Sequence, residues 1–340
     1  MLSNGEESGS GKTVAILGGG AMGTACATVL ARNPAHRIRL WVRNPTFAQH
    51  IAETRENTRL LPGVRLPETV LVASQHADVL SSSTVVLICI PTSGIRSAVA
   101  VVRDMIPADA LLVSTVKGIE NGTLIRPSQI LQELLGDRPV VALGGPCHAE
   151  DLARGRPTSV VAACEDLEQA ERIRNAFSGE TLRVYSNSDL KGVELGGALK
   201  NVIAIAAGIC DGLQLGDNAK AALITRGLAE MNRFCQVMKT ASDTLFGLAG
   251  IGDLVATCGS RHSRNRRVGE LLGQGQTLTE IQESMHAVAE GVFTARSVRS
   301  IARQYQLDMP IAMEVCRVLF DGRSPRDATD ELMQRPLRGE

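Results

Sequence analysis

Aromatic residues are scarce in this chain, and neither sign of charge is in excess. Phe, Trp and Tyr make up 3% of the 340 residues, and 36 Lys and Arg balance 36 Asp and Glu, so the formal net charge is zero. Proteins that bind nucleic acid or anionic membranes usually carry a basic excess, and single strands are commonly held by stacking on aromatic rings. We therefore expect no nucleic-acid partner.

Metal-binding spacings are also missing. No two of the eight cysteines are spaced as CxxC, and none of the six histidines lies in an HExxH pattern. Structural zinc sites normally need clustered ligands at such spacings, so we expect no metal site. Scattered cysteines are typical of reduced, buried thiols, and we expect a cytoplasmic protein.

Apolar runs that suggest a signal peptide or a membrane span are absent, with one exception. The first residues, MLSNGEESGSGKT, contain no apolar stretch, and we expect residues 1–10 to be a disordered tail. Their GSGKT resembles a phosphate-binding P-loop, but the motif needs a preceding strand and a glycine where Glu6 stands. The exception, 193–209, is rich in Ala and Gly and contains Glu194 and Lys200. This favours a buried core helix, and we expect no integral membrane segment.

Short Val/Ile/Leu runs alternate with helical patterns in the first half of the chain. Strands are predicted at 13–18, 37–42, 84–91, 110–118, 139–146, 159–164 and 181–187. Continuous apolar strands separated by helices are typical of a parallel sheet covered on both faces, which is a doubly wound α/β domain. From Leu190 onward the patterns are helical. We therefore predict an α/β domain over 11–188 and an all-helical domain over 189–340.

A glycine-rich segment follows the first predicted strand. GGGAMG places Gly18, Gly20 and Gly23 in GxGxxG register just before a predicted helix. In that context the first glycine permits a tight turn, the second lets the backbone approach a pyrophosphate, and the third allows close helix–strand packing. The helix N-terminus adds free N–H groups for the phosphates. A flexible turn is the alternative, but the context favours a Rossmann dinucleotide site.

The end of the second predicted strand bears on the choice between NAD and NADP. An acidic residue there would bind the ribose 2′-hydroxyl of NAD, but the sequence reads LWVRNP and places Arg43 at this point. Arginine pairs well with a 2′-phosphate. A solvated arginine at a strand end is the alternative. We expect NADP, or use of both NADP and NAD.

Lys200 lies in an otherwise apolar helical pattern, GGALKNVIAI at 196–205. Lysine is rarely buried without a partner, so this ammonium either extends to a surface or has a chemical role. Burial lowers a lysine pKa from about 10.4 toward neutrality, where the group can donate and accept a proton. A nearby carboxylate such as Asp253 would oppose that shift.

A basic cluster, SRHSRNRR at 260–267, could hold a phosphate group. Arginine forks bind phosphate through paired hydrogen bonds. For Arg266 and Arg267 we keep the alternative of a solvated basic face. The neighbouring Cys147 and His148 could suggest a thiol nucleophile, but sequence neighbours rarely face each other as a catalytic pair.

Several ordered motifs together resemble a known family. LGGGAMGTA, STVKGIE, GGPCHAE, VYSNSDLKGVELGGALKNVIAIAAG, ALITRGLAEM, GLAGIGDLVATC, SRNRRVG and AEGVFTA are similar to bacterial-type NAD(P)-dependent sn-glycerol-3-phosphate dehydrogenases, from about Val14 to about Arg326. The resemblance implies a Rossmann domain followed by a helical domain. It also implies interconversion of dihydroxyacetone phosphate and sn-glycerol 3-phosphate, which feeds glycerophospholipid synthesis. Two other functions stay open: another NADP-dependent keto-acid reductase with a catalytic lysine, and a dinucleotide sensor without turnover.

The resemblance also implies the residues of the site. Lys200 matches the catalytic lysine. The positions that match substrate contacts are Lys117, Gly145, Cys147, Lys200, Asp253, Ser263, Arg264 and Asn265. The positions that match cofactor contacts are Ala21, Met22, Lys117, Ala149, Arg264, Val288 and Glu290.

Two positions depart from the family pattern. Ala21 stands where a hydroxyl residue is frequent, and Cys147 stands where Ser or Thr is common. A thiol is a weaker hydrogen-bond donor than a hydroxyl.

The expected partner is a small phosphorylated substrate, and the sequence leaves a homodimer open.

Overall fold

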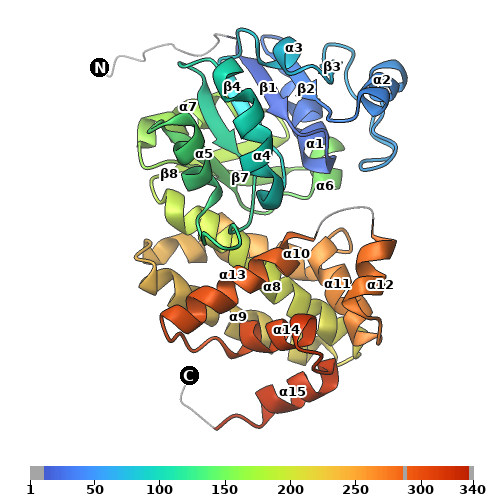
Figure 1. Cartoon of the computed structure of the whole chain (residues 1–340), viewed down its shortest axis with the longest axis vertical. Coiled ribbons are helices and arrows are strands. Elements are labelled where there is room, and N and C mark those ends of the chain that lie inside the picture. The colour runs from blue at the N-terminus through green and yellow to red at the C-terminus, as the bar shows by residue number, and fades with distance from the viewer. Residues whose placement is uncertain (1–10, 286–288, 337–340) are drawn as a thin grey trace.

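The computed structural model describes residues 11–285 and 289–336. The tail predicted at 1–10 lies outside the described residues, as does Val288. A half that contains the sheet occupies the top of Figure 1, and a helical half occupies the bottom. The predicted fold class, a Rossmann-type α/β domain followed by a helical domain, is confirmed.

One sheet of eight strands forms the centre of the first half, in the order β3-β2-β1-β4-β5-β6-β7-β8. Alternate residues of β1 enter two different cores: Val14 and Ile16 one, Ala15 and Leu17 the other. Both faces of the sheet are therefore covered, as its continuous apolar strands predict. The strands are β1 Thr13–Leu17, β2 Arg37–Trp41, β3 Leu71–Ala73, β4 Val85–Ile88, β5 Leu111–Ser114, β6 Val140–Gly144, β7 Thr158–Ala163 and β8 Leu182–Asn187.

The covering helices come from the connections between these strands. They are α1 Ala21–Leu30, α2 Pro45–Thr54, α3 His76–Leu80, α4 Thr92–Val102, the short 3-10 helix η1 Arg103–Met105, α5 Pro127–Leu135, α6 Ala149–Ala153 and α7 Leu167–Phe177.

The sheet differs from the prediction in three places. β7 runs antiparallel to β6, whereas the sequence predicts a parallel sheet. The connection 145–157 contains only the five-residue helix α6, and a parallel crossover normally needs a longer covering helix. β3 is an unpredicted edge strand of three residues, which are too few to show a periodicity. β5 ends at Ser114 instead of residue 118, which leaves Lys117 in the loop after it.

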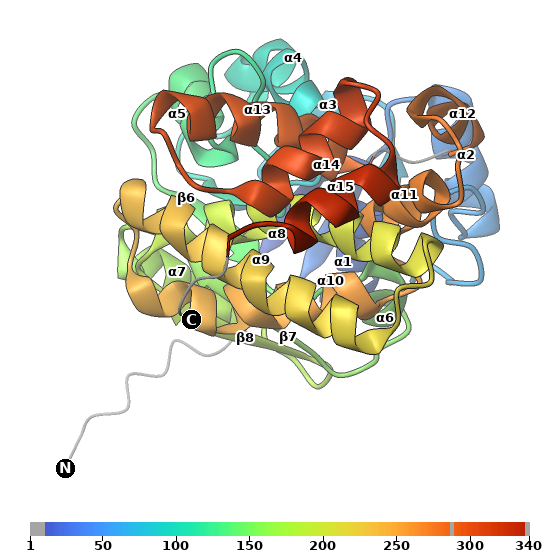
Figure 2. The same cartoon turned by 90° about the horizontal axis from the view of Figure 1, so that it is seen from below.

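Helix α8 (Leu190–Gly212) passes through the middle of the helical half, as Figure 2 shows. The elements around it are α9 Asp217–Val237, the 3-10 helix η2 Ser242–Phe246, the π-helix η3 Leu248–Gly252, α10 Asp253–Gly259, α11 Arg264–Gly273, α12 Leu278–Ser284, α13 Glu290–Gln304, α14 Pro310–Phe320 and α15 Pro325–Met333. Among the described helices, α8 alone is long and apolar enough to cross a bilayer, yet its apolar window is 100% buried within the protein. A helix that is apolar all round and buried is a core helix.

Glycines let α8 and α11 approach each other closely. A Cβ on Gly208 would lie 1.9 Å from the carbonyl oxygen of Arg266, and a Cβ on Gly269 would lie 1.9 Å from that of Ile205. No side chain fits at either position, so the two backbones are in direct contact. This crossing fixes the start of α11, with Ser263–Asn265, beside Lys200 and Asn201 on α8.

Candidate active site

The glycine-rich turn joins β1 to α1 and leaves the N-terminus of α1 open. Gly18 has φ of +123°, and a Cβ there would lie 2.7 Å from the carbonyl oxygen of Cys89. A Cβ on Gly23 would lie 1.9 Å from the Gly18 oxygen. Gly20 has open space around its Cβ position, and no side chain caps the helix that starts at Ala21. Free N–H groups in an uncrowded turn fit a dinucleotide pyrophosphate.

Two further residues predicted to contact the cofactor lie around this turn. Met22 is half-buried near the start of α1. Arg43 follows β2, which pairs in parallel with β1. It therefore lies beyond the carboxyl ends of the strands, on the same side of the sheet as Gly18. Its side chain is exposed and available to a ligand.

Lys200 and Lys117 share one buried carboxylate. Lys200 Nζ donates to Asp253 Oδ1 at 2.7 Å, and Lys117 Nζ donates to Asp253 Oδ2 at 2.6 Å. Lys200 also donates to Thr257 Oγ1 at 2.5 Å, and Lys117 to the carbonyl oxygen of Gly145 at 2.8 Å. Asp253 and Lys200 are 1% and 5% exposed. The ammonium of Lys200 therefore does not extend to the surface.

Burial and the neighbouring charges act in opposite directions on the pKa of Lys200 and on the pKa of Asp253. Burial lowers the pKa of Lys200 to about 8, and the Asp253 carboxylate opposes this without cancelling it. Burial also pushes the pKa of Asp253 upward, but Lys117 and Lys200 outweigh it and hold that pKa below its ordinary value. At neutral pH the carboxylate is ionised, while Lys200 carries a proton that it can readily lose.

A chain of side-chain amides extends from this cluster to α11 and α13. Asn201 Nδ2 donates to the carbonyl oxygen of Lys117 at 3.1 Å, and its Oδ1 accepts from Asn265 Nδ2 at 2.9 Å. Asn265 Oδ1 in turn accepts from the backbone N–H of Gly291 at 2.9 Å. These bonds hold the loop after β5, helix α8 and the start of α13 in one arrangement.

The loop after β6 provides three more of the predicted residues. Gly145 has φ of +104°, which lets its carbonyl face Lys117. Cys147 is half-buried, and burial raises the pKa of its thiol to about 11, so it remains protonated. Ala149 is the buried first residue of α6. His148 Nε2 lies 3.3 Å from the carbonyl oxygen of Ala256, so that ring nitrogen faces α10.

A small apolar cavity of about 40 Å³ is lined by residues of both the glycine-rich turn and the lysine cluster. Met22, Lys117 and Cys147 all line it. The cofactor turn and the lysine cluster therefore share one wall.

The starts of α11 and α13 carry the remaining predicted residues. Ser263 is buried and caps α11 by accepting from the backbone N–H of Arg266 at 3.2 Å. Arg264, the next residue, is exposed. The Glu290 carboxylate accepts from the backbone N–H of Thr92 at 3.1 Å and from its hydroxyl at 2.9 Å. Burial raises the pKa of Glu290.

The expectation for Arg266 is wrong, because it is not part of a solvated basic face. Its guanidinium forms ion pairs with Asp211 and Glu270 and donates to the carbonyl oxygen of Ser260 at 3.1 Å. The side chain is 13% exposed and anchors the start of α11. Arg267 is exposed, as predicted, and pairs with Glu270.

Within 11–285 and 289–336, no three His, Cys, Asp or Glu side chains gather in a group that could hold a metal ion.

Comparison with known families identifies one that matches both halves of the chain. The profile for the NAD-dependent glycerol-3-phosphate dehydrogenase N-terminus matches residues 13–170, and the C-terminus profile matches 189–330. The chain belongs to this dehydrogenase family. The two matches cover the glycine-rich turn, both lysines and Asp253.

Relatives support this membership over nearly the full length. Glycerol-3-phosphate dehydrogenase [NAD(P)+] of Chlorobium limicola is 44% identical over 96% of this chain and 99% of its own. The protein of the same name from Geobacillus thermodenitrificans is 45% identical over 97% and 96%. A crystal structure of glycerol-3-phosphate dehydrogenase from Coxiella burnetii superposes with a TM-score of 0.92 at 36% identity, covering 96% of this chain and all of that one. The keto-acid reductase and sensor alternatives are not favoured.

In this dehydrogenase the structure adds Thr257 and Asn201 to the residues predicted from sequence. Thr257 is 3% exposed and lies one helical turn after Asp253, on the same face of α10. The i, i+4 spacing from Asp253 is the signal that could have identified it. Asn201 is adjacent to Lys200, and its role in joining three elements is visible only in the tertiary contacts.

Proposed function

We propose that Lys200 is the group that gives and takes the proton when this dehydrogenase interconverts dihydroxyacetone phosphate and sn-glycerol 3-phosphate. The observation that carries the proposal is a buried ammonium held between Asp253 and Thr257, with a pKa lowered to about 8. General acids work best when their pKa lies near the working pH. Lys200 meets that condition, and its position in a core helix keeps it fixed.

The reaction requires a proton because reduction of a ketone leaves an alkoxide. The bound nicotinamide supplies the hydride. Lys200 Nζ then donates its proton to the alkoxide oxygen, and in the reverse direction the neutral amine accepts the hydroxyl proton. Asp253 orients the ammonium through Oδ1, and its second oxygen holds Lys117 beside it. Two adjacent ammonium groups stabilise developing negative charge, and their fixed orientation removes the need to reorganise during the reaction.

We assign substrate and cofactor binding to the elements around this pair. Arg264 would pair with the substrate phosphate, helped by Ser263, Asn265, Gly145 and Cys147. In support, Arg264 is exposed at the N-terminus of α11, where the helix dipole also favours an anion.

By the same reasoning, NAD(P) would bind at the carboxyl ends of the strands. Gly18–Gly23 would hold the pyrophosphate and Arg43 the 2′-phosphate. Lys117, Ala149 and Arg264 would also contact the cofactor, and Glu290 would lie near the nicotinamide side. Ala21 lacks a hydroxyl, so the phosphate would rely on backbone N–H groups at the start of α1.

Reducing conditions suit the cysteines of this enzyme. All eight are free, and six of them are buried. Disulfides are rare in reducing compartments, so these free thiols support our proposal that the enzyme works in the cytoplasm. Its product feeds glycerophospholipid synthesis there.

Substitution of Lys200 tests the proposal. Lys200→Met keeps a long, apolar side chain in the core, so the protein should fold and bind NADPH. Turnover should fall by at least about 10²–10⁴-fold, the usual contribution of a general acid. NADPH oxidation followed by absorbance, NADPH affinity and the melting temperature are measured together. A folded Lys200→Met enzyme with near-normal turnover would move the proton transfer to Lys117.

The pH dependence provides a second readout. Because the acid form of Lys200 is needed for reduction, kcat for dihydroxyacetone phosphate should decline above a pH of about 8. Oxidation of glycerol 3-phosphate needs the neutral amine and should rise through the same pH. Profiles that move in the same direction for both reactions would contradict this assignment.

A further inference from the structure

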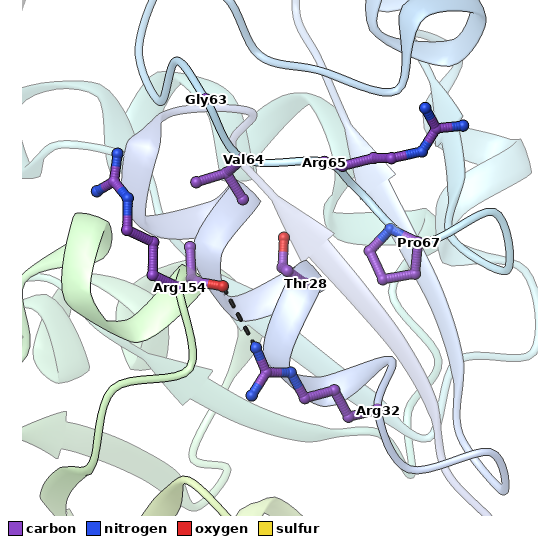
Figure 3. A pocket seen from close by; sticks show the side chains of 8 residues that line it. Thr28, Arg32, Gly63, Val64, Arg65, Pro67 and Arg154 are labelled. Carbon is purple, nitrogen blue, oxygen red and sulfur yellow. Dashed lines mark hydrogen bonds between the residues drawn. The ribbon is translucent and has the colours of Figure 1, made fainter.

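A second hollow lies on the sheet half, between the end of α1, the loop at 63–67 and α6. Its volume is about 300 Å³. Figure 3 shows Arg154, Arg65 and Arg32 around it, with Thr28 and Val64 between them. None of its lining residues is among those assigned above to substrate or cofactor, so it is separate from the active site.

The lining of this hollow is basic. It contains three arginines and no carboxylate. Two carboxylates that contact the lining are engaged: Glu68 pairs with Arg65 and Arg55, and Glu56 accepts from the backbone N–H of Gly63 at 2.7 Å. Among the ion pairs of the described residues, neither Arg32 nor Arg154 has a carboxylate partner. Arg65 is therefore compensated by Glu68, while Arg32 and Arg154 give the hollow a positive charge that no carboxylate in its lining neutralises.

The arginines at this hollow keep donors available. Arg154 donates only to the carbonyl oxygens of Glu150 and Pro62, at 3.2 and 3.5 Å. Arg32 donates to Thr181 Oγ1 at 2.9 Å and to the carbonyl oxygen of Ala153 at 3.4 Å. A guanidinium has more N–H groups than these bonds use. Both side chains are exposed, so they can turn toward a ligand without breaking buried contacts.

We propose that this hollow binds a small phosphate monoester and that its occupancy is linked to cofactor binding. Arginine forks match a phosphate dianion better than a single carboxylate, and the volume suits a small metabolite. The link follows from the elements that form the hollow. α1 begins at the glycine-rich turn and α6 begins at Ala149, so a ligand between their far ends would restrain both helices that carry assigned cofactor residues.

Phosphate binding to paired variants tests the site. Inorganic phosphate is titrated by calorimetry into the full-length enzyme, Arg32→Gln/Arg154→Gln, and the control Arg172→Gln, an exposed arginine on α7. The wild-type enzyme and the control should bind phosphate at the hollow in addition to the phosphate positions of the active site. In the double variant one site should weaken about ten- to a hundredfold, the usual loss for charge-assisted bonds. Identical binding by all three proteins would overturn the site.

The link to the cofactor has its own measurement. Phosphate competes with NADPH at the active site in every variant, so only the difference between the wild-type enzyme and the double variant reports on the hollow. We expect the effect of added phosphate on NADPH affinity to differ between the wild-type enzyme and the double variant by about fivefold or more. NADPH must change phosphate affinity at the hollow by the same factor. No difference would overturn the link. All three proteins should still reduce dihydroxyacetone phosphate without added inorganic phosphate, since none of the substituted arginines is assigned to the active site, and this separates failure here from failure of the proposed active site.

Discussion

At the scale of single residues, Arg43 is placed to distinguish the two nicotinamide cofactors. It is exposed and follows β2 at the edge of the sheet where the glycine-rich turn lies. Rossmann domains that select NAD commonly carry an acid at this position, where it binds the ribose hydroxyl. No carboxylate stands in its place here, so on our proposal the 2′-phosphate of NADP would pair with the Arg43 cation.

Arg43→Asp should therefore reverse the cofactor preference. We expect the Michaelis constant for NADPH to rise about ten- to a hundredfold, since a charge-assisted bond to phosphate is lost and a repulsive charge is added. The constant for NADH should change little or improve. Arg37→Asp is the matched control, because Arg37 is exposed at the opposite end of the same strand. Equal changes in the Michaelis constants for NADPH and NADH would contradict a role for Arg43 in binding the 2′-phosphate.

At the scale of elements, the crossing of α8 and α11 determines the geometry of the site. Lys200 and Asn201 lie on α8, while Ser263–Asn265 lie at the start of α11. Backbone contact at Gly208 and Gly269 sets the distance between them. Any side chain added there must separate the helices.

Gly208→Ala should lower both stability and substrate affinity. Inserting a methyl group 1.9 Å from the Arg266 carbonyl forces a backbone shift, and such overpacking costs about 1–3 kcal/mol. The same shift moves Arg264, so the Michaelis constant for dihydroxyacetone phosphate should rise. Urea unfolding and steady-state kinetics measure the two effects. Gly259→Ala is the control, since its Cβ position is open, and a similar loss in that variant would show that the crossing is not special.

Helix α14 is capped by a carboxylate from another helix. Glu230 on α9 is 1% exposed and accepts from the backbone N–H groups of Ile311 and Ala312 at 2.7 and 3.1 Å. These are orphan donors in the first turn of α14. Burial raises the pKa of Glu230 to about 7, although both N–H bonds act to lower it.

This carboxylate should make stability depend on pH. The folded state binds more protons than the unfolded state between the ordinary carboxyl pKa and about 7, so the unfolding free energy should fall as pH rises through that window. Glu230→Gln cannot titrate and should lack this part of the decline. Urea unfolding of both proteins from about pH 5 to about pH 8 makes the comparison, and parallel curves would show that Glu230 does not titrate there.

At the scale of the whole molecule, the active site exists only where the two halves meet. Lys117 and Gly145 come from loops of the sheet half, and Lys200 and Asp253 from the helical half. A second buried connection, Arg126 with Glu194, joins the loop before α5 to α8. Ser128 adds a backbone and a hydroxyl bond to the same carboxylate at 2.8 and 2.6 Å.

Removing one side of this connection should destabilise the entire protein. Glu194→Gln leaves the Arg126 guanidinium buried without a counter-charge, which costs about 3–5 kcal/mol. Replacing both partners, as Arg126→Met/Glu194→Leu, should cost much less. Asp321→Asn removes the exposed partner of Arg299 and should cost less than about 1 kcal/mol. Equal losses for the buried and exposed pairs would contradict the role of Glu194 in holding the halves together.

Prediction from the sequence succeeded where the signal is local. The apolar runs identify seven of the eight strands, because a buried strand needs continuous Val, Ile and Leu within a few residues. The glycine-rich turn is equally local, since Gly18 and Gly23 are required by contacts within one strand–turn–helix unit. The sequence does not predict the edge strand β3, because three residues are too few to show a periodicity, nor the direction of β7, because that direction depends on how the connection from β6 packs.

The sequence by itself determined the doubly wound sheet and the core position of α8, because periodicity and turn chemistry act over a few neighbouring residues. Most of the candidate site residues were implied by the resemblance of their motifs to the dehydrogenase family. Only the tertiary structure decided what those residues do to one another. Asp253 is 53 positions from Lys200 and 136 from Lys117, yet one carboxylate holds both. Arg266, which the sequence places in a solvated cluster, pairs with Asp211 from another helix. Burial and charge pairing depend on contacts between distant segments, so the pKa of Lys200 follows from the folded chain alone.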